Sequence, residues 1–143
     1  MIKEILVYPD NKEVLSQISK ETNAKECQDL IQDLKDTLKA STGVGIAAIQ
    51  IGVPKRVCYI NYNNEEIVMI NPVITWTRNS KKIFQEGCLS SPKIYKPIER
   101  YQKVTCKYIN ENGEEKEISQ GGWLSAIIQH ELDHLDGICK VSE

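Results

Sequence analysis

The sequence has no apolar run near the roughly 20 residues that a membrane-spanning helix needs. Its first residues, Met-Ile-Lys-Glu, lack the charged and then apolar pattern of a secretory signal. Neither sign of charge dominates, since 18 Lys and Arg stand against 20 Asp and Glu, and proteins that bind nucleic acids are usually strongly basic. We therefore expect a cytoplasmic protein that binds neither nucleic acid nor a membrane.

Repeats, low-complexity tracts and linkers rich in Gly, Ser or Pro are also absent. A chain of 143 residues with 41% hydrophobic residues suits a single domain, 1–143, with one continuous core. The five cysteines are odd in number and widely spaced, without a Cys-x-x-Cys pair. Buried, reduced thiols are therefore expected rather than a disulfide framework.

Two segments have the apolar spacing of a helix. Asn23, followed three residues later by Glu26, has the pattern of an N-cap, and the residues behind it predict a helix over about 24–41. Helical spacing returns over 122–137, where the final glycine suits the position just after a helix end.

The middle of the chain is rich in β-branched residues. Short strands are predicted over 57–60, 67–70 and 73–76, joined by tight turns at Asn63-Asn64 and Asn71-Pro72. Residues 104–108 and 116–118 are expected to pair as a hairpin. The order of elements predicts an α+β domain of mostly antiparallel strands around a central helix, with an N-terminal helix.

The only two histidines, His130 and His134, lie in one motif, Gln-His-Glu-Leu-Asp-His. Residues four apart share one helix face, about 6 Å apart along the axis, so both imidazoles can bind one metal ion. Glu131 lies about 100° further round the helix and can reach a water molecule at the metal as a general base. The plain alternative is a pair of surface histidines, or one buried histidine with a hydrogen bond.

A catalytic metal of this kind takes a third protein ligand and keeps one position open. Lys140 stands where a metzincin would have its third histidine, and too few residues follow His134 for a ligand on a further helix. Cys139 and an upstream thiolate remain as donors. Cys139 would have to fold back past a helix-ending glycine, so Cys88 is preferred, in segment 85–92, which is interpreted as a loop.

A third segment, 43–52, is small and apolar and carries a single amide, Gln50. Taken alone it predicts a glycine-rich turn that leads into a buried strand, and it lacks the Gly-Lys-Ser/Thr of a phosphate-binding loop. Together, GVGIAAIQIG, EGCLS and QHELDHLDG resemble, in this order, the motifs of the peptide deformylases. The resemblance runs from about residue 5 to residue 140.

The resemblance implies an enzyme that removes the formyl group from N-formylmethionyl nascent peptides and releases formate. Cys88, His130 and His134 would hold one divalent metal ion, with Fe(II) as the native ion and Zn, Ni or Co as other occupants. Water bound to the metal would attack the formyl carbon, with Glu131 as general acid/base. Such an iron–thiolate site should be sensitive to oxygen.

The resemblance also implies roles for residues around the metal. Gln50 and the backbone N–H of Leu89 would stabilise the oxyanion that forms as the formyl carbon becomes tetrahedral. Glu86 and Arg100 resemble a structural ion pair beside the site.

Substrate recognition is expected to use an apolar pocket beside the metal. Helical spacing places Trp123 and Ile127 on the stripe of the two histidines, although ordinary core residues would show the same spacing. Segment 44–46 resembles the family strand that pairs with the substrate backbone. The candidates for substrate binding are Val44, Gly45, Ile46, Glu86, Trp123, Ala126 and Ile127.

Some features depart from the family pattern. Ile46 replaces the usual leucine, and Ser91 stands where a branched apolar residue is common. The chain stops at Glu143, similar to short phage-encoded forms, whereas many bacterial relatives continue into a long helix; ribosome contact is therefore doubtful, and a monomer is expected.

Two other functions fit parts of the same pattern. One is a small metallopeptidase that cleaves unformylated peptides, and the other is a metal-binding or peptide-binding domain without activity. The presence of Glu131 and Gln50 speaks against the second. The basic residues of the stretch that follows Cys88 are expected to form a solvated strand face; they are Lys93, Lys96, Arg100, Lys103 and Lys107.

Overall fold

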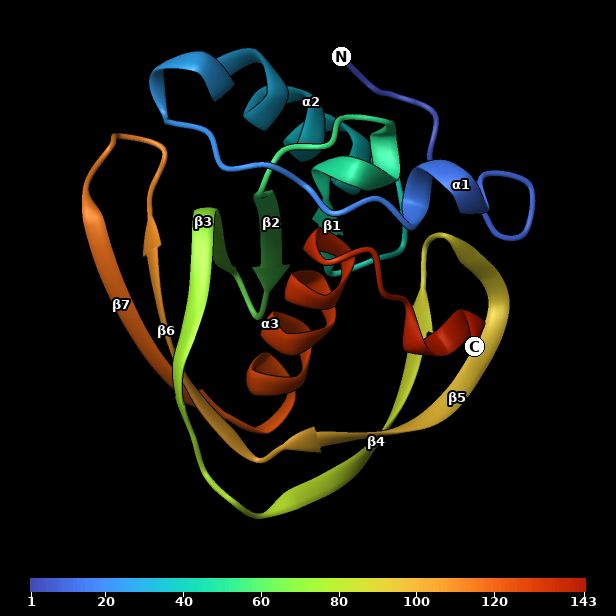
Figure 1. Ribbon diagram of the computed structural model, residues 1–143, viewed down its shortest axis with the longest axis vertical. Coiled ribbons are helices and arrows are strands. Elements are labelled where there is room, and N and C mark those ends of the chain that lie inside the picture. Colours follow the sequence, from blue (N-terminus) through green and yellow to red (C-terminus); the bar gives the residue numbers. More distant parts are fainter.

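The computed structural model describes all 143 residues and places a central helix, α3, between a curved sheet and a separate hairpin (Figure 1). The elements in chain order are α1 (Lys12–Leu15), a 3-10 turn η1 (Lys25–Cys27), α2 (Gln28–Lys39), β1 (Gly45–Ala47), a 3-10 turn η2 (Ala48–Ile51), β2 (Val57–Tyr62), β3 (Glu65–Thr77), β4 (Lys81–Cys88), β5 (Ser91–Tyr101), β6 (Lys103–Ile109), β7 (Glu115–Gly121), α3 (Gly122–Leu135) and a 3-10 turn η3 (Lys140–Ser142).

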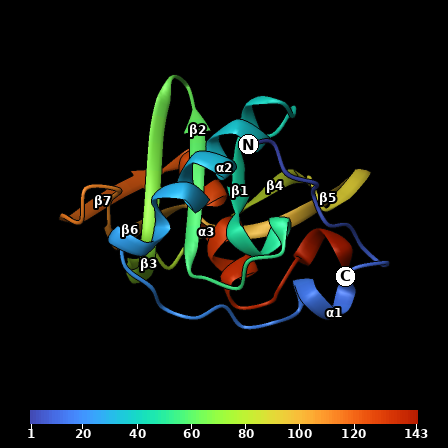
Figure 2. The same cartoon turned by 90° about the horizontal axis from the view of Figure 1, so that it is seen from above.

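All strand pairs are antiparallel. Five strands form the main sheet in the order β1-β2-β3-β6-β7, and β4 pairs only with β5. Figure 1 and Figure 2 both show α3 between β3, β6 and β7 on one side and the β4–β5 hairpin on the other. The predicted α+β class, with antiparallel strands around a central helix, is confirmed.

Strand β2 shows why the main sheet is covered on both faces. Successive strand residues point to opposite faces. Cys58 and Ile60 belong to the core cluster that contains α3, whereas Val57 and Tyr59 belong to the cluster formed with α2. All four residues are buried for this reason, and the sheet lies between the two helices.

Helix α3 is a core helix, since 11 of its 14 residues are buried. It ends as the sequence predicts: Gly137 has φ 77°, its N–H donates to the carbonyl of His134, and the N–H of Ile138 donates to that of Asp133. Five of the buried residues are polar or charged, which is rare unless such groups have partners or a function; they are Ser125, Gln129, His130, Glu131 and His134.

Three further predictions hold. The predicted helix over 24–41 is present as η1 followed by α2, and Oδ1 of Asn23 accepts a hydrogen bond from the N–H of Glu26 at 3.0 Å. The hairpin about residues 110–113 joins β6 to β7. The turn at Asn63-Asn64 joins β2 to β3, and both asparagines have positive φ, as the tight two-residue turns of hairpins require.

The turn predicted at Asn71-Pro72 is wrong, because β3 runs through both residues. The pairing of β3 with β6 shifts register between Ile70 and Val73, so Asn71, with φ 52°, lies in a bulge. The Asn71 side chain also binds the backbone of Thr22, accepting from its N–H at 3.0 Å and donating to its carbonyl at 2.7 Å.

Segments 43–52 and 85–92 also differ from the structure that was predicted for them. Only Gly45–Ala47 of segment 43–52 is a strand, and Ala48–Ile51 form η2. The segment interpreted as a loop is part of the β4–β5 hairpin, with Cys88 as the last residue of β4 and a register shift at Gly87/Cys88. Polar residues and two prolines interrupt the alternation of apolar and polar residues by which strands are predicted.

The basic stretch is a solvated face only in part. Lys93, Lys103 and Lys107 are exposed, but Arg100 is 2% exposed because it is bound by two carboxylates.

The structure contains no helix that is long and apolar enough to span a bilayer.

Candidate active site

Three potential metal ligands converge where β4 meets α3. One ligand atom each from Cys88, His130 and His134 lies within 4.8 Å of the others. Nε2 of His134 is 3.3 Å from Sγ of Cys88 and 3.2 Å from Nε2 of His130. One sulfur and two imidazole nitrogens form a donor set that suits zinc, iron and nickel. Of the two cysteines considered from the sequence, Cys88 joins the histidines and Cys139 does not.

A buried network holds the first of these histidines. Nδ1 of His130 lies 2.9 Å from Oε1 of Glu86. Arg100 donates two hydrogen bonds to the Glu86 carboxylate, at 2.8 and 2.9 Å, and a third to Oδ2 of Asp133 at 2.6 Å. The expected ion pair of Glu86 and Arg100 is therefore present and is linked directly to a metal-ligand candidate.

The charges of this network fix the histidine for metal binding. Burial alone would raise the pKa of Glu86, but hydrogen bonds from Arg100 and His130 lower it. The same contact raises the pKa of His130, although burial opposes this. A carboxylate at Nδ1 holds the ring proton there and leaves Nε2 as the lone-pair donor, the usual arrangement of a metal-binding histidine. The residues therefore fit a divalent cation.

His134 and Glu131 are both deeply buried. Burial lowers the pKa of His134 well below its usual value, which keeps the ring neutral and able to bind a metal, and its Nδ1 has no hydrogen-bond partner. Burial raises the pKa of Glu131 to about 7, and its Oε1 also has no partner. A carboxylate with such a pKa can gain and lose a proton near neutral pH.

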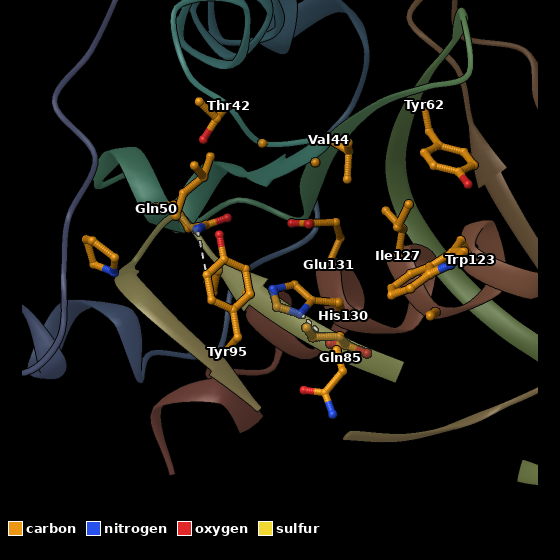
Figure 3. Close-up of a pocket in the computed structure, with 18 of the residues that line it drawn as sticks. Thr42, Val44, Gln50, Tyr62, Gln85, Tyr95, Trp123, Ile127, His130 and Glu131 are labelled. Atoms are coloured by element: carbon orange, nitrogen blue, oxygen red, sulfur yellow. Dashed lines mark hydrogen bonds and ion pairs between the residues drawn. The ribbon is translucent and has the colours of Figure 1, made fainter. Parts of the chain in front are cut away.

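The Glu131 side chain extends into the pocket toward Gln50 (Figure 3). Its position requires the glycine at position 45. A Cβ atom at Gly45 would lie 2.6 Å from Oε2 of Glu131, closer than real Cβ atoms approach other atoms. Gly45, in the motif GVGIAAIQIG, therefore leaves space for Glu131, in the motif QHELDHLDG.

Gln50 is fixed at the end of a short turn. Its Oε1 accepts from the N–H of Ala47 at 2.9 Å, and its Nε2 donates to Oγ of Ser90 at 3.0 Å and lies 3.7 Å from Sγ of Cys88. These contacts leave the amide no freedom to flip. Nε2 is thus oriented toward the ligand cluster, and the N–H of Leu89 has no backbone or side-chain acceptor.

A pocket of about 860 Å³ opens beside the cluster. The walls come from the segment before β1, the β4–β5 hairpin and α3 (Figure 3). The sequence-predicted residues that line it are Val44, Gly45, Gln50, Glu86, Cys88, Leu89, Trp123, Ala126, Ile127, His130 and Glu131.

Ile46 does not line the pocket with its side chain, and its expected part in pairing with the substrate backbone stays a prediction. The Ile46 side chain is fully buried in the cluster formed with α2. Trp123 is 46% exposed and lines the pocket. Its ring lies edge to face with that of Phe84, with the ring centroids 4.9 Å apart. Ile127 belongs to the core and the pocket at once.

Several pocket residues were not anticipated from the sequence. Tyr95 and Lys93 lie on β5, where only a solvated strand face was expected, and Tyr62 ends β2. Two others act beside the site, since Ser90 binds Gln50 and Asp133 binds Arg100. The only signal for Ser90 and Asp133 was their place inside the motifs. The further lining residues are Thr42, Gly43, Gln85, Gly87 and Pro92.

Comparison with known proteins assigns the family. Residues 2–143 match the family model described as polypeptide deformylase. A peptide deformylase of Fusobacterium nucleatum is 41% identical over 148 residues, covering 100% of this chain and 84% of the relative.

Solved structures agree with this assignment. A peptide deformylase from Legionella pneumophila superposes with a TM-score of 0.90 at 39% identity, covering 97% of this chain and 83% of that one. A structure from Synechococcus phage S-SSM7, described as a probable peptide deformylase, has a TM-score of 0.90 at 34% identity and covers 97% of both chains. The resemblance seen in the three motifs is confirmed, and the chain belongs to the peptide deformylase family of metal-dependent hydrolases, which remove the N-formyl group from nascent polypeptides.

Proposed function

We propose that this chain deformylates N-formylmethionyl peptides at a divalent metal ion held by Cys88, His130 and His134, with Glu131 as general acid/base. One observation carries the proposal: a sulfur and two imidazole nitrogens lie within 4.8 Å of one another, beside a buried carboxylate oxygen that has no partner. The open pocket gives a peptide access to both.

The resident ion is proposed to be Fe(II), with Zn, Ni and Co as other occupants. Imidazole and thiolate donors accept all of these ions, so the choice of iron rests on the family. A bound divalent cation supplies Lewis-acid polarisation of the formyl oxygen and lowers the pKa of water to about 7. The substitutions predicted below test the residues independently of which ion is present.

Glu131 is the group that moves the proton. Its free Oε1 accepts the proton of the attacking water, and the carboxylic acid then donates it to the amine nitrogen as the C–N bond of the formamide breaks. Burial raises the pKa of Glu131 to about 7, so both protonation states are accessible near neutral pH.

Two donors are proposed to stabilise the developing oxyanion. Nε2 of Gln50 is held by Ser90 at the edge of the ligand cluster, and the N–H of Leu89 lies in the adjoining hairpin turn. Donors that are fixed before the reaction stabilise the new charge without reorganising, and losing one typically costs about 10²–10³ in rate.

The formylmethionine side chain is proposed to lie against Trp123, Ala126 and Ile127, which form the apolar wall of the pocket. The peptide backbone pairs with Val44 and Gly45 at β1, the edge strand of the main sheet. Pairing through the main chain accepts many sequences after the first residue. Glu86 acts through His130, because both oxygens of its carboxylate are already bonded.

The wider setting is proposed from the same site. A monomer built as one domain over 1–143 is proposed, as expected from the sequence. We propose the cytoplasm as the location of this activity, because new polypeptides are made there.

The direct test is formate release from a formyl-methionyl peptide by protein purified without oxygen. We expect turnover by the natural sequence and a fall of about 10²–10⁴-fold for Glu131→Gln, since the amide cannot take the proton. Metal content should be unchanged, because Glu131 is not a ligand. Glu117→Gln, an exposed change on β7, serves as the control. A fully metallated protein that cleaves only unformylated peptides would refute the proposal.

Gly45→Ala is predicted to lower kcat while the metal stays bound. The added methyl group would lie 2.6 Å from Oε2 of Glu131 and must displace the carboxylate. A double-mutant cycle checks the cause: in the Glu131→Gln background, Gly45→Ala should add little further loss. Equal losses in both backgrounds would show that the glycine acts elsewhere.

Glu86→Gln is predicted to weaken metal binding about 10- to 100-fold, the usual effect of changing a residue that orients a metal-bound histidine. Competition with a chelator measures the affinity directly. Glu99→Gln, an exposed change on the same hairpin, should leave it unchanged. Full metal affinity in Glu86→Gln would mean that the carboxylate does not orient His130.

A further inference from the structure

The protein holds a second thiol beside the proposed ligand Cys88. Cys139 is 5% exposed and forms a small apolar cluster with Ile98 and Val141, and Cys88 packs against this cluster. Both cysteines are free thiols. Cys88 and Cys139 therefore lie in the same cluster without being bonded to each other.

Cys139 has no part in the proposed reaction. The ligand cluster contains Cys88 and the two histidines but not Cys139, so Cys88 meets the histidines and Cys139 at once. Oγ of Ser142, in η3, donates a hydrogen bond to Sγ of Cys139 at 3.3 Å. Because η3 contacts both β4 and β5, this segment holds Cys139 against the end of β4.

Among the five cysteines, Cys88 alone lines the pocket. The remaining three, Cys27, Cys58 and Cys106, are fully buried in the two larger core clusters. A small oxidant that enters the pocket therefore reaches Cys88 first, and the thiol that can respond is Cys139.

We propose that Cys139 is a resolving thiol, which captures oxidised Cys88 as an intramolecular Cys88–Cys139 disulfide when the metal site is empty. The inference rests on the proposed role of Cys88 as a metal ligand, because a bound ion would occupy the sulfur that the oxidant attacks. It assigns Cys139 to the protection of that ligand.

The chemistry balances with hydrogen peroxide as the oxidant. The Cys88 sulfur attacks one peroxide oxygen, the O–O bond breaks, and the products are a sulfenic acid and one water. The Cys139 sulfur then attacks Sγ of Cys88, the S–O bond breaks, and a second water leaves with the thiol proton. Two thiols are oxidised by two electrons and one peroxide is reduced to two waters.

The disulfide has a different fate from the alternative product. Without a nearby thiol, a sulfenic acid is oxidised further to sulfinic and sulfonic acids, which ordinary thiols do not reduce. A disulfide is returned to two thiols by thiol exchange. Cys139 thus makes loss of the ligand reversible.

The test treats metal-depleted protein with hydrogen peroxide and reads the product by intact mass, thiol titration and peptide mapping. We expect the loss of two hydrogens, a fall from five free thiols to three, and one linked peptide joining Cys88 to Cys139. Dithiothreitol should restore five thiols and metal binding. Oxygen added to Cys88 without a disulfide, or a disulfide to another cysteine, would overturn the inference.

Variants identify the resolving residue. In Cys139→Ser, Cys88 should gain oxygen and fail to recover with dithiothreitol, and Cys139→Val repeats this test with an apolar replacement. Cys106→Ser, a change at another buried cysteine, should still form the linkage. A reversible response that persists in both Cys139 variants would contradict the proposal.

The metal-loaded protein separates this inference from the proposed function. Oxidation should slow when the ion is bound. If the Cys88–Cys139 linkage forms at the same rate with and without metal, Cys139 is still the resolving thiol but Cys88 is not the ligand. Because mass is the readout, the inference does not depend on deformylase activity.

Discussion

The buried contact of Glu86 with Arg100 and His130 determines the site, because it fixes the β4–β5 hairpin to α3. Strand residues two apart share a face and helix residues four apart share a face. With Glu86 bound to His130, Cys88 lies beside His134 at the end of the same strand. Burying such a network is costly unless every charge is satisfied, and Arg100 satisfies two carboxylates at once.

Burial also gives the site its chemistry. The core helix holds His134 neutral and Glu131 with a pKa of about 7, because α3 is covered by the sheet on one side and the hairpin on the other. The glycine at 45 leaves space for the glutamate, and the turn after β1 fixes Gln50. Three segments far apart in sequence thus supply the residues proposed as metal ligands, proton carrier and oxyanion donor.

The sequence predicted those parts whose pattern is local. The His-Glu-x-x-His spacing, the helix end at Gly137 and the cap at Asn23 each depend on neighbours within a few residues. The hairpin bearing Cys88 was missed, because prolines and polar residues interrupt its alternation. The sequence could not show which face of β1 the side chain of Ile46 occupies, since that is set by the pairing of β1 with β2. Arg100 was counted with the solvated basic face although the resemblance paired it with Glu86, and its second partner, Asp133, lies 33 residues away and was not predicted.

The most direct measurement is X-ray absorption at the metal edge of zinc-loaded protein. The account predicts one sulfur at about 2.3 Å and two imidazole nitrogens at about 2.0–2.1 Å, with the sulfur shell lost in Cys88→Ser and kept in Cys139→Ser. A coordination shell without sulfur, or one that keeps its sulfur in Cys88→Ser, would contradict coordination of the ion by residues of both β4 and α3.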